Sequence, residues 1–524
     1  MRLRDYQIDT CASILDAWRK HDSVMSVLFT GGGKTEVFVH LANHWEDGRV
    51  LVIAPLITLV SQAAKKITQR TGIAPGIEQA QQFSNEHEYM RSPFIVASKQ
   101  TLTGKSKRYK RLRDVGLVIV DECHLATTSI YKEMLDYFIE RGAKVLGVTA
   151  TPNRHDGIAM DEMFEHCASN IGIPEGTSQG WLVRCKAHCV QLDSLDLSEV
   201  STYGKKGDFK QGELGKVMET EKVVFEVADV TARESGNLKT VVFCAAVNEA
   251  QAVAEVLRDR YGKKADWICG DKARCSSERR SEVLSSFTED PEGLQFVCNV
   301  GVLTTGWDFP GLEHIVQARP TKSLSLHTQI FGRATRPLEG VVDFDGSTAE
   351  TRIAAIAASD KTHFKMTDLV DNSMEHKIVT SADVLGGWAT IQIIERARQN
   401  MQNAQEALDV EEALTEAERQ LKIEERAFKK KIEEERKRIQ RAAIEARANY
   451  RSLEVDPFDP NRQAASVRRG GTNCMPFGKH KGMPIPDLPF DYLDWMIKNV
   501  TLKEGWLKGS IMKEYRNRTI GLTK

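Results

Sequence analysis

The sequence predicts an α/β protein with two tandem domains, each a doubly wound parallel sheet, followed by a long charged helical region and a small C-terminal module. Three observations predict this fold. Short apolar runs rich in β-branched residues alternate with amphipathic segments in residues 1–155, and the same alternation returns in residues 236–345. Such runs are typical of strands buried on both faces of a parallel sheet. Residues 391–450 then contain almost no Gly or Pro and are rich in Glu, Lys, Arg and Ala.

The expected elements follow the chain in order. In the first domain we expect strands at Val24–Phe29, Val50–Ala54, Phe94–Ala97, Leu117–Val120 and Val145–Val148, and helices that include Gln7–Trp18 and Thr35–Asn43. In the second domain we expect strands at Thr240–Cys244, Ala265–Ile268, Phe296–Asn299 and Ile315–Ala318, and a helix at Glu249–Arg260. Residues 156–235, which are rich in Gly, Ser and charge, are expected to be a linker or insertion, and residues 346–390 a connecting segment.

The remaining chain has three parts. Residues 391–450 are expected to form a charged helix or helical hairpin, residues 451–470 a linker and residues 471–524 a last small module. Apolar residues of the helix lie roughly on a seven-residue repeat, namely Leu421, Phe428, Ile432, Ile439, Ala443 and Ala446. A coiled-coil arm and a helix packed along the protein's own surface are equally favoured.

Composition limits the class of protein. The 524 residues allow about three to four domains, and 72 Lys plus Arg balance 73 Asp plus Glu, which excludes a globally basic nucleic-acid coat. No apolar run approaches the roughly 18 residues that a membrane span needs, and no signal-peptide pattern opens the chain. We therefore expect a cytoplasmic protein; the expectation of a prokaryotic or phage-infected cell comes from the last module of the chain and its resemblance, described below.

The ten cysteines are scattered and form no C-x-x-C pair, which indicates free thiols in a reducing compartment. Cys185, His188 and Cys189 are the one group that resembles half of a zinc site. Because a second pair of ligands at the usual spacing is missing, a bound metal there is the less favoured interpretation.

A glycine-rich loop follows the first expected strand. The run Thr30-Gly-Gly-Gly-Lys-Thr35 leads from that strand into a helix. Glycines let successive backbone N–H groups turn inward around phosphate oxygens, and the helix N-terminus adds a favourable dipole. Lys34 would reach the β- and γ-phosphates, and Thr35 would ligate Mg²⁺.

Two carboxylates end a buried strand in the run from Leu117 to His124, which reads LVIVDECH. Adjacent acids at such a place are costly unless a cation or water compensates them. Asp121 suits the Mg²⁺ shell, and Glu122 suits the general base that orients and deprotonates the attacking water.

With these two motifs in place, the sequence resembles superfamily 2 helicases and translocases over residues 1–345. The motifs occur in the family's order: Leu3–Gln7 (Gln motif), Val52–Leu56 with Leu59 and Gln62 (Ia), Ser98–Leu102 (Ib), Asp121–His124 (II), Thr149–Thr151 (III), Val241–Cys244 (IV), Thr304–Asp308 (V) and Gln329–Arg336 (VI). The run Thr149–Gly157, TATPNRHDG, resembles DNA-acting members such as the XPB, UvsW and RadD-like groups, although the RadD-like cysteine cluster is missing.

The resemblance implies two RecA-like domains with ATP and Mg²⁺ bound between them, and it assigns roles to individual residues. It implies catalytic roles for Lys34, Asp121, Glu122, Arg333 and Arg336, with Thr35 and Asp121 as the Mg²⁺ ligands. It implies ATP binding by Arg4, Gln7, Thr30, Gly31, Gly32, Gly33, Lys34, Thr35, Gly306 and Asp308. His124, Thr149, Thr151 and Gln329 would couple the ATP site to a nucleic-acid track that includes Pro55, Thr58, Gln100 and Thr101.

The last module contains the run Met475–Gly482, MPFGKHKG, and resembles a small Phe-Gly-Lys-x-Lys-Gly module of prokaryotic and phage proteins. From Val467 to Lys524 eleven Lys and Arg face five Asp and Glu, a net charge of +6. Basic residues interleaved with aromatics favour DNA binding through Lys479 and Lys481. We expect the aromatic residues Phe477, Tyr492 and Trp495 to form mostly the core of the module.

The leading hypothesis is an ATP-dependent DNA helicase or translocase that unwinds or remodels single-stranded, forked or branched DNA in replication, recombination or repair. Replication or repair proteins would bind through the helical arm or the last module. The alternatives are a motor subunit of a restriction or nuclease system, an ATP-regulated binding or annealing protein and, less favoured, an RNA helicase. Asp343 and Asp345 after motif VI are expected at a strand end and not in a nuclease site.

Overall fold

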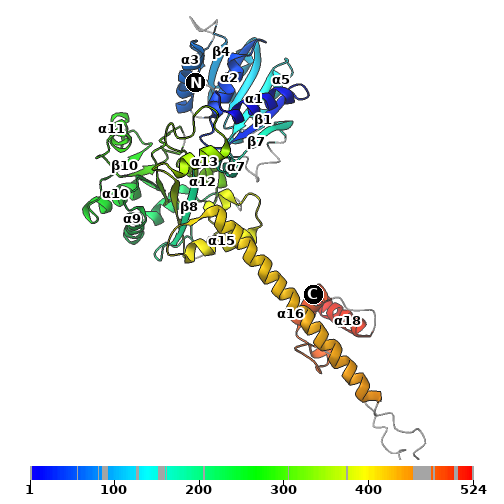
Figure 1. The fold of residues 1–524 in the computed structure, drawn as a ribbon. Helices are drawn as coiled ribbons and strands as arrows, with labels where there is room; N and C mark the ends of the chain where they lie inside the picture. Colours follow the sequence, from blue (N-terminus) through cyan, green and yellow to red (C-terminus); the bar gives the residue numbers. More distant parts are fainter. Residues whose placement is uncertain are drawn as a thin grey trace, which may run out of the picture. The chain divides into compact units, whose positions relative to one another are not determined.

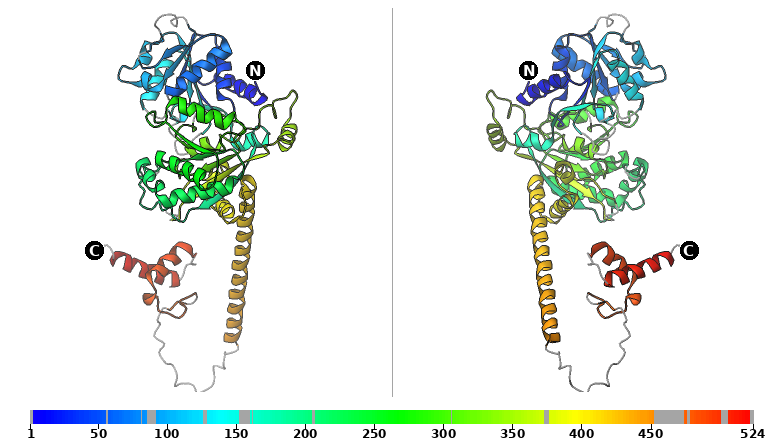
Figure 2. Two further views of the ribbon diagram at one scale, coloured as in Figure 1. Left: turned by 90° about the vertical axis from the view of Figure 1, so that its left-hand side faces the viewer. Right: turned by 90° about the vertical axis from the view of Figure 1, so that its right-hand side faces the viewer.

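The computed structural model describes residues 3–55, 57–80, 82–84, 92–125, 129–151, 160, 162–204, 207–304, 306–372, 376–451, 474–475, 478–500 and 506–521. The chain divides after Phe428 into two compact units, and each is described by itself (Figure 1). The first unit contains two sheet-based domains that lie next to each other (Figure 2). Two tandem parallel-sheet domains followed by a helical region confirm the predicted fold class.

The first sheet has seven parallel strands in the order β3-β4-β2-β5-β6-β1-β7. Its strands are β1 Ser23–Leu28, β2 Arg49–Ala54, β3 Gly76–Glu78, β4 Phe94–Ser98, β5 Val115–Asp121, β6 Lys144–Thr149 and β7 His166–Ile171. The five expected strands are confirmed to within two residues. The sequence analysis missed the edge strands β3 and β7, which are short or polar and pair on one side alone.

Helices cover both faces of this sheet. They are α1 Asp5–Ala17, α2 Lys34–Asn43, α3 Ile57–Thr71, α4 Lys99–Thr103 and α5 Ser129–Ile139, with the short 3-10 turns η2 Arg108–Arg111 and η3 Cys123–Leu125. Val50 and Val52 pack in the core beneath α1, α2 and α3, whereas Leu51 and Ile53 pack beneath α4 and α5. Because successive strand residues point to opposite faces, a continuous apolar run is what a sheet covered on both sides requires.

The second sheet also has seven strands, in the order β10-β11-β9-β12-β13-β8-β14, with β14 alone antiparallel. Its strands are β8 Arg184–Gln191, β9 Thr240–Phe243, β10 Ala265–Cys269, β11 Phe296–Val300, β12 His314–Gln317, β13 His363–Val370 and β14 Leu408–Asp409. The helices that follow β7 are α7 Ile173–Ser178, α8 Gln211–Met218, α9 Glu221–Ser235, α10 Val247–Asp259, α11 Ser277–Thr288, α12 Leu324–Phe331, α13 Ala349–Ala357, α14 Ser381–Leu385 and α15 Ile391–Asn403.

The expected boundaries of the second domain are wrong in two places. Residues 156–235 are not an irregular linker, because they supply β7 to the first sheet and β8 and α9 to the second domain. Residues 346–390 are not a mere connection, because β13 lies inside the second sheet between β12 and β8. In β8, exposed Arg184 and Lys186 alternate with buried Cys185 and Ala187, a period of two that its charges obscure in the sequence.

Helix α16, Val410–Arg451, has 42 residues and confirms the predicted helical region. Its first turns are anchored by buried Val410 and Leu414. Farther along, Phe428, Ile432 and Ile439 of the expected seven-residue repeat are exposed. The coiled coil stays a prediction.

The C-terminal unit contains η4 Ile485–Asp487, α17 Phe490–Asn499 and α18 Trp506–Gly521. Its core is formed by the aliphatic and methionine side chains Met475, Ile485, Leu488, Leu493, Met496 and Ile511. The expected aromatic core is therefore wrong, since Trp495 is 51% exposed and Tyr492 is half-buried. Leu493 and Met496, three residues apart, face the core, which turns Trp495 outward. Phe477 lies outside the described residues.

Candidate active site

The phosphate loop, residues Thr30–Thr35, connects the carboxyl end of β1 to the first turn of α2. Gly33 caps α2 in the left-handed region with a φ of 77°, and Gly31 has a φ of 84°. A Cβ on Gly31 would lie 2.8 Å from Nε of Arg336, so the second domain approaches the loop too closely for any side chain there. The glycines thus serve both loop shape and contact between the domains.

Gln7 and Arg4, at the start of α1, lie beside this loop. The Gln7 side chain donates from Nε2 to the carbonyl oxygen of Gly32 over 2.8 Å, and its Oε1 accepts from the backbone N–H of Arg4 over 2.9 Å. The Arg4 guanidinium donates to both carboxylate oxygens of Asp343, each over 2.8 Å. Asp343 and Asp345 lie in a loop, which corrects their expected position at a strand end, and the Arg4–Asp343 pair joins the two domains.

Asp121 ends β5, and Glu122 follows with a φ of 47°, a strained conformation for a residue with a side chain. Lys34 Nζ donates to Glu122 Oε1 over 2.7 Å. Burial alone would raise the pKa of Glu122, but Lys34 and His124 outweigh it and hold that pKa below its ordinary value. Burial, reinforced by the neighbouring Glu122, raises the pKa of Asp121. Asp121 is therefore a half-buried carboxylate whose charge is undercompensated.

Arg333 and Arg336 come from the segment that follows α12 in the second domain. Arg333 donates to the backbone carbonyls of Thr304 and Trp307, and burial lowers its pKa to about 10. Arg336 pairs with the carboxylate of Asp308. Motif V thus holds both motif VI arginines, one through carbonyls and one through a side chain.

Lys361, which the sequence analysis missed, is hydrogen-bonded to the backbone beside motifs V and VI. Its Nζ donates to the carbonyls of Pro310 over 2.6 Å and of Arg336 over 2.7 Å, and the residue is 2% exposed. Burial lowers its pKa to about 7. A solitary lysine before a strand gives no sequence signal of this role.

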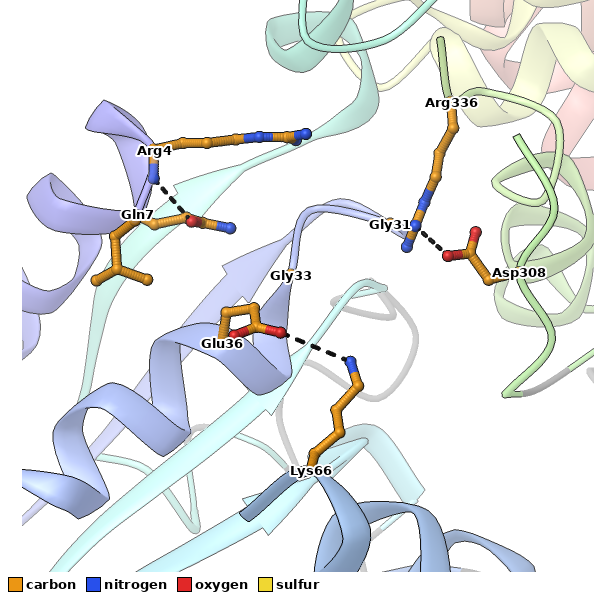
Figure 3. A pocket seen from close by; sticks show the side chains of 9 residues that line it. Arg4, Gln7, Gly31, Gly33, Glu36, Lys66, Asp308 and Arg336 are labelled. Atoms are coloured by element: carbon orange, nitrogen blue, oxygen red, sulfur yellow. Dashed lines mark hydrogen bonds and ion pairs between the residues drawn. The ribbon is translucent and has the colours of Figure 1, made fainter. Parts of the chain in front are cut away.

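The start of α1, the phosphate loop and Arg336 with its partner Asp308 enclose a cleft of about 150 Å³ (Figure 3). Its lining comprises Leu3, Arg4, Gln7, Gly31, Gly33, Glu36, Lys66, Asp308 and Arg336. The sequence analysis missed Glu36 and Lys66, whose charged groups lie 4.0 Å apart across the cleft. The cleft is smaller than the roughly 300–1,000 Å³ of ordinary ligand sites, because Arg336 lies over Gly31 and Lys34 is paired with Glu122.

A chain of polar contacts leads from the carboxylates into the second domain. Glu122 Oε2 lies 3.4 Å from His124 Nδ1, and that nitrogen lies 2.9 Å from Thr149 Oγ1. Thr149 Oγ1 accepts from the backbone N–H of Thr151 over 3.1 Å. The hydroxyl of Thr151 lies 3.1 Å from that of Ser325 on α12. His124, Thr149 and Thr151, three of the expected coupling residues, thus contact one another in series. Ser325, which the sequence analysis missed, continues this series of contacts into the second domain.

Two glycines mark further close contacts between the domains. A Cβ on Gly332, at the end of α12, would lie 2.3 Å from Cβ of Thr30. A Cβ on Gly306 would lie 2.7 Å from Oε1 of Gln62 on α3. Gln329, the fourth expected coupling residue, is half-buried on α12.

The expected nucleic-acid residues follow the carboxyl ends of β2 and β4. Gln100 is exposed and its Nε2 donates to the carbonyl of Pro55 over 3.3 Å, so these two residues are neighbours. The hydroxyl of Thr101 accepts from Ser98 Oγ over 2.7 Å and is used within the fold. The side chain of Thr58 lies outside the described residues.

Cys185, His188 and Cys189 do not form a metal site. Both cysteines are buried on one face of β8, whereas His188 faces the other side and its Nδ1 lies 3.1 Å from Glu234. Within the described ranges, no group of three or more His, Cys, Asp or Glu is placed to hold a metal ion.

Comparison with known families decides the assignment. The model of the Type III restriction enzyme res subunit matches residues 1–154, and that of the helicase conserved C-terminal domain matches residues 221–337, together more than half of the chain. The chain belongs to helicase superfamily 2. A third model, of a quorum-sensing-regulated virulence factor, matches residues 468–514 of this helicase-family chain.

Among curated relatives, the ATP-dependent helicase IRC3 of Saccharomyces cerevisiae is 27% identical, and the match covers 67% of this chain and 53% of IRC3. The EcoAI endonuclease subunit of Escherichia coli is 25% identical over 64% of this chain and 44% of its own length. The helicase uvsW of Enterobacteria phage T4 is 22% identical over 59% and 61%. The chain thus spans about half the length of the first of these relatives.

Among solved structures, the Type ISP restriction-modification enzyme LlaBIII bound to DNA matches with a TM-score of 0.51 and 15% identity, over 72% of this chain and 32% of that one. This likeness supports the fold. In the part of the chain that the structure describes, no helix is long and apolar enough to cross a membrane.

The contact between Gly332 and Thr30 predicts the effect of a single methyl group. Gly332→Ala should lower the free energy of unfolding by about 1–3 kcal/mol, because an added carbon has no room. The control is Gly212→Ala, at an exposed helical position with open space, which should be neutral or stabilising by up to about 1 kcal/mol. Thermal unfolding of both variants measures this, and equal midpoints would show that the two domains do not pack as described.

Proposed function

We propose that the chain is an ATP-driven DNA helicase or translocase that couples ATP hydrolysis to unwinding or remodelling of branched DNA. The observation that carries this proposal is that the charged residues of the site come from both domains. Lys34 and Glu122 belong to the first domain, whereas Arg333 and Arg336 belong to the second; Arg333 lies close enough to Glu122 to interact electrostatically, and Arg336 lies against Gly31 of the phosphate loop. Hydrolysis then depends on how the domains meet, which is what a motor requires.

In this proposal each group of the cleft has one task. Lys34 and the backbone N–H groups of the loop hold the triphosphate, and Glu122 orients the attacking water and accepts its proton. Binding of ATP draws Lys34 from Glu122 to the phosphates, which frees the carboxylate to act as a base. Arg333 and Arg336 stabilise the charge that spreads over the transferring phosphoryl group.

Thr35 and Asp121 would hold Mg²⁺, which supplies positive charge that neutralises the phosphate oxygens. The residues fit this ion. Asp121 is a half-buried carboxylate with a raised pKa, so a cation beside it would be strongly favoured. Thr35, which carries a hydroxyl, lies in the first turn of α2 directly after the phosphate-loop glycines.

DNA would contact the edge formed by Pro55 and Gln100 and continue onto the second domain. Such contacts go mainly to phosphates and carry little sequence information. The series of polar contacts from Glu122 through Thr149 to Ser325 would couple the state of the nucleotide to DNA binding. The names of several relatives, an ATP-dependent DNA helicase and a DNA 3'-5' translocase among them, support DNA as the substrate.

A motor subunit of a restriction system is the second candidate, and a specific observation favours it. The first family model describes a restriction enzyme subunit, and two curated relatives are endonuclease subunits of Type I restriction enzymes. Incubating the chain with circular DNA, Mg²⁺ and ATP tests this candidate. Cleavage by the chain alone, or in complex with co-purified subunits, would replace the helicase proposal.

The first prediction of this mechanism concerns the paired charges of the cleft. Lys34→Ala should abolish ATP hydrolysis because the phosphate-neutralising charge is lost, and Glu122→Gln should bind ATP but not turn it over because the base is lost while the shape remains. Phosphate release and binding of a fluorescent ATP analogue measure the two steps. The matched control is Glu140→Gln, an exposed residue at the end of α5. Turnover at the unmodified rate in Glu122→Gln would refute the assignment of the base.

The second prediction concerns the arginines of the other domain. Arg333→Ala and Arg336→Ala should retain ATP binding but hydrolyse ATP roughly 10³–10⁵ times more slowly, the measured value of such arginines elsewhere. Arg419→Ala, at an exposed position of α16, is the control. If both cleft variants hydrolyse ATP normally in the presence of DNA, the second domain does not complete the site.

A third prediction separates the substrate classes. Single-stranded and forked DNA should stimulate ATP hydrolysis more than RNA of the same sequence, and the chain should separate a forked duplex in an ATP-dependent way. Steady-state phosphate release and a fluorescent strand-separation assay measure this. Greater stimulation by RNA would identify an RNA helicase, and strand annealing without separation would favour the annealing alternative.

A further inference from the structure

The C-terminal unit has a pair of stacked aromatic rings at its surface, of which Tyr492 packs partly against the core and Trp495 is exposed. Trp495 is 51% exposed on α17, and its ring stacks on that of Tyr492 with centroids 5.9 Å apart and planes 20° apart. Leu493 and Met496 of the same helix fill the core. A large ring that the core does not use, held parallel to a second ring, is a flat apolar surface open to a partner.

The glycine-rich loop of this unit is attached to the same rings. Gly478 has a φ of 79°, and a Cβ there would lie 2.5 Å from the hydroxyl oxygen of Tyr492, so the loop backbone rests on that side chain. The ring of His480 meets the ring of Tyr492 with centroids 4.6 Å apart. Lys479 and Lys481 are the neighbours of His480 on both sides and are exposed. The loop thus presents two cations beside the stacked rings.

The charges around the rings favour an anionic partner. The described residues from 474 to 521 contain seven Lys and Arg and four Asp and Glu. Asp494, next to Trp495, is balanced by Lys498 Nζ at 2.7 Å. Lys479 and Lys481 form no ion pair with any residue that the structure describes here. Cations that lack a carboxylate partner and lie beside a stacked ring pair match a strand of phosphates with free bases.

We propose that Tyr492 and Trp495, with Lys479 and Lys481, form a stacking platform for an unpaired DNA strand. Bases would stack on Trp495, and the two lysines would contact the adjacent phosphates. A duplex fits this surface poorly because its bases are already stacked and paired. The choice of DNA rests on the proposed function, and the platform would hold the strand on which the motor acts.

The test uses the full chain and a fluorescein-labelled oligothymidylate, with binding followed by anisotropy without nucleotide. Trp495→Ala should weaken binding about fivefold or more, the loss expected for one stacked base, and Trp495→Phe should restore most of it. Tyr203→Ala, an aromatic residue 65% exposed in the first unit, is the control for loss of an exposed ring. Equal binding by Trp495→Ala and the unmodified chain would overturn the proposal.

Salt dependence separates the two parts of the platform. Each phosphate contact with a single strand contributes about 0.7 to the slope of log K against log salt, so Lys479→Ala with Lys481→Ala should lower the slope by about 1.4. Trp495→Ala should leave the slope unchanged. The matched control is Lys513→Ala with Arg516→Ala, which removes two exposed cations of the same unit. An equal drop in the slope for both double variants would show that DNA is attracted by the positive charge of the unit in general and not by these two lysines, which would overturn the proposal.

Deletion of residues 471–524 completes the test and distinguishes it from failure of the motor. The truncated chain should keep its basal ATP hydrolysis but need more DNA for half-maximal stimulation. If DNA does not stimulate hydrolysis at all while Trp495→Ala still weakens oligothymidylate binding, the proposed motor fails and the platform stands. Binding of a duplex as tight as that of the single strand, or of oligouridylate tighter than oligothymidylate, would overturn the assignment of unpaired DNA.

Discussion

The packing of the motif VI segment against the phosphate loop is the contact on which the rest of the site depends. Gly332 lies against Thr30, and Arg336 extends over Gly31, so the second domain packs directly on the loop of the first. Both contacts require glycine because a single added carbon would overlap a neighbour. The result is a cleft filled by the protein's own side chains.

Ion pairs inside the cleft take the place of the ligand's charges. Lys34 pairs with Glu122, and Arg336 pairs with Asp308. The Lys34–Glu122 pair is largely buried, so desolvation offsets most of its attraction, but loss of either partner would leave a costly unpaired charge. The Arg336–Asp308 pair is more exposed and contributes little net free energy. Exchange of one set of partners for a triphosphate is therefore feasible, whereas removal of one partner is not.

The connection between the two sheet domains would allow them to move relative to each other when these ion pairs exchange partners. In the described residues the backbone passes from the first sheet to the second between β7 and β8, a stretch that contains α7. Besides this connection, the domains meet through polar contacts such as Arg4–Asp343 and Thr151–Ser325. Polar contacts can be remade at small cost when the domains shift. Apolar packing also continues from the first domain towards the second, for example where the rings of Tyr6 and Trp181 meet with centroids 5.2 Å apart.

The sequence by itself determined the phosphate loop, the carboxylate pair and the interior strands, because each is written in consecutive residues. A run such as Leu117–Asp121 is apolar on both faces and ends in a carboxylate wherever the strand is placed. It also determined the order of the motifs, and hence the family. The sequence analysis did not predict edge strand β7 or the charged strands β8 and β13, because these strands are buried by partners distant in sequence.

Only the tertiary structure decided which side chains share the cleft. Lys361 and Asp343 are ordinary charged residues in the sequence, and their roles arise from carbonyls and an arginine that folding brings to them. Trp495 was assigned to a core by its residue type, yet a helix buries one face alone, and Leu493 and Met496 occupy that face. Contacts between distant segments depend on three-dimensional packing, for which a single sequence carries no local signal.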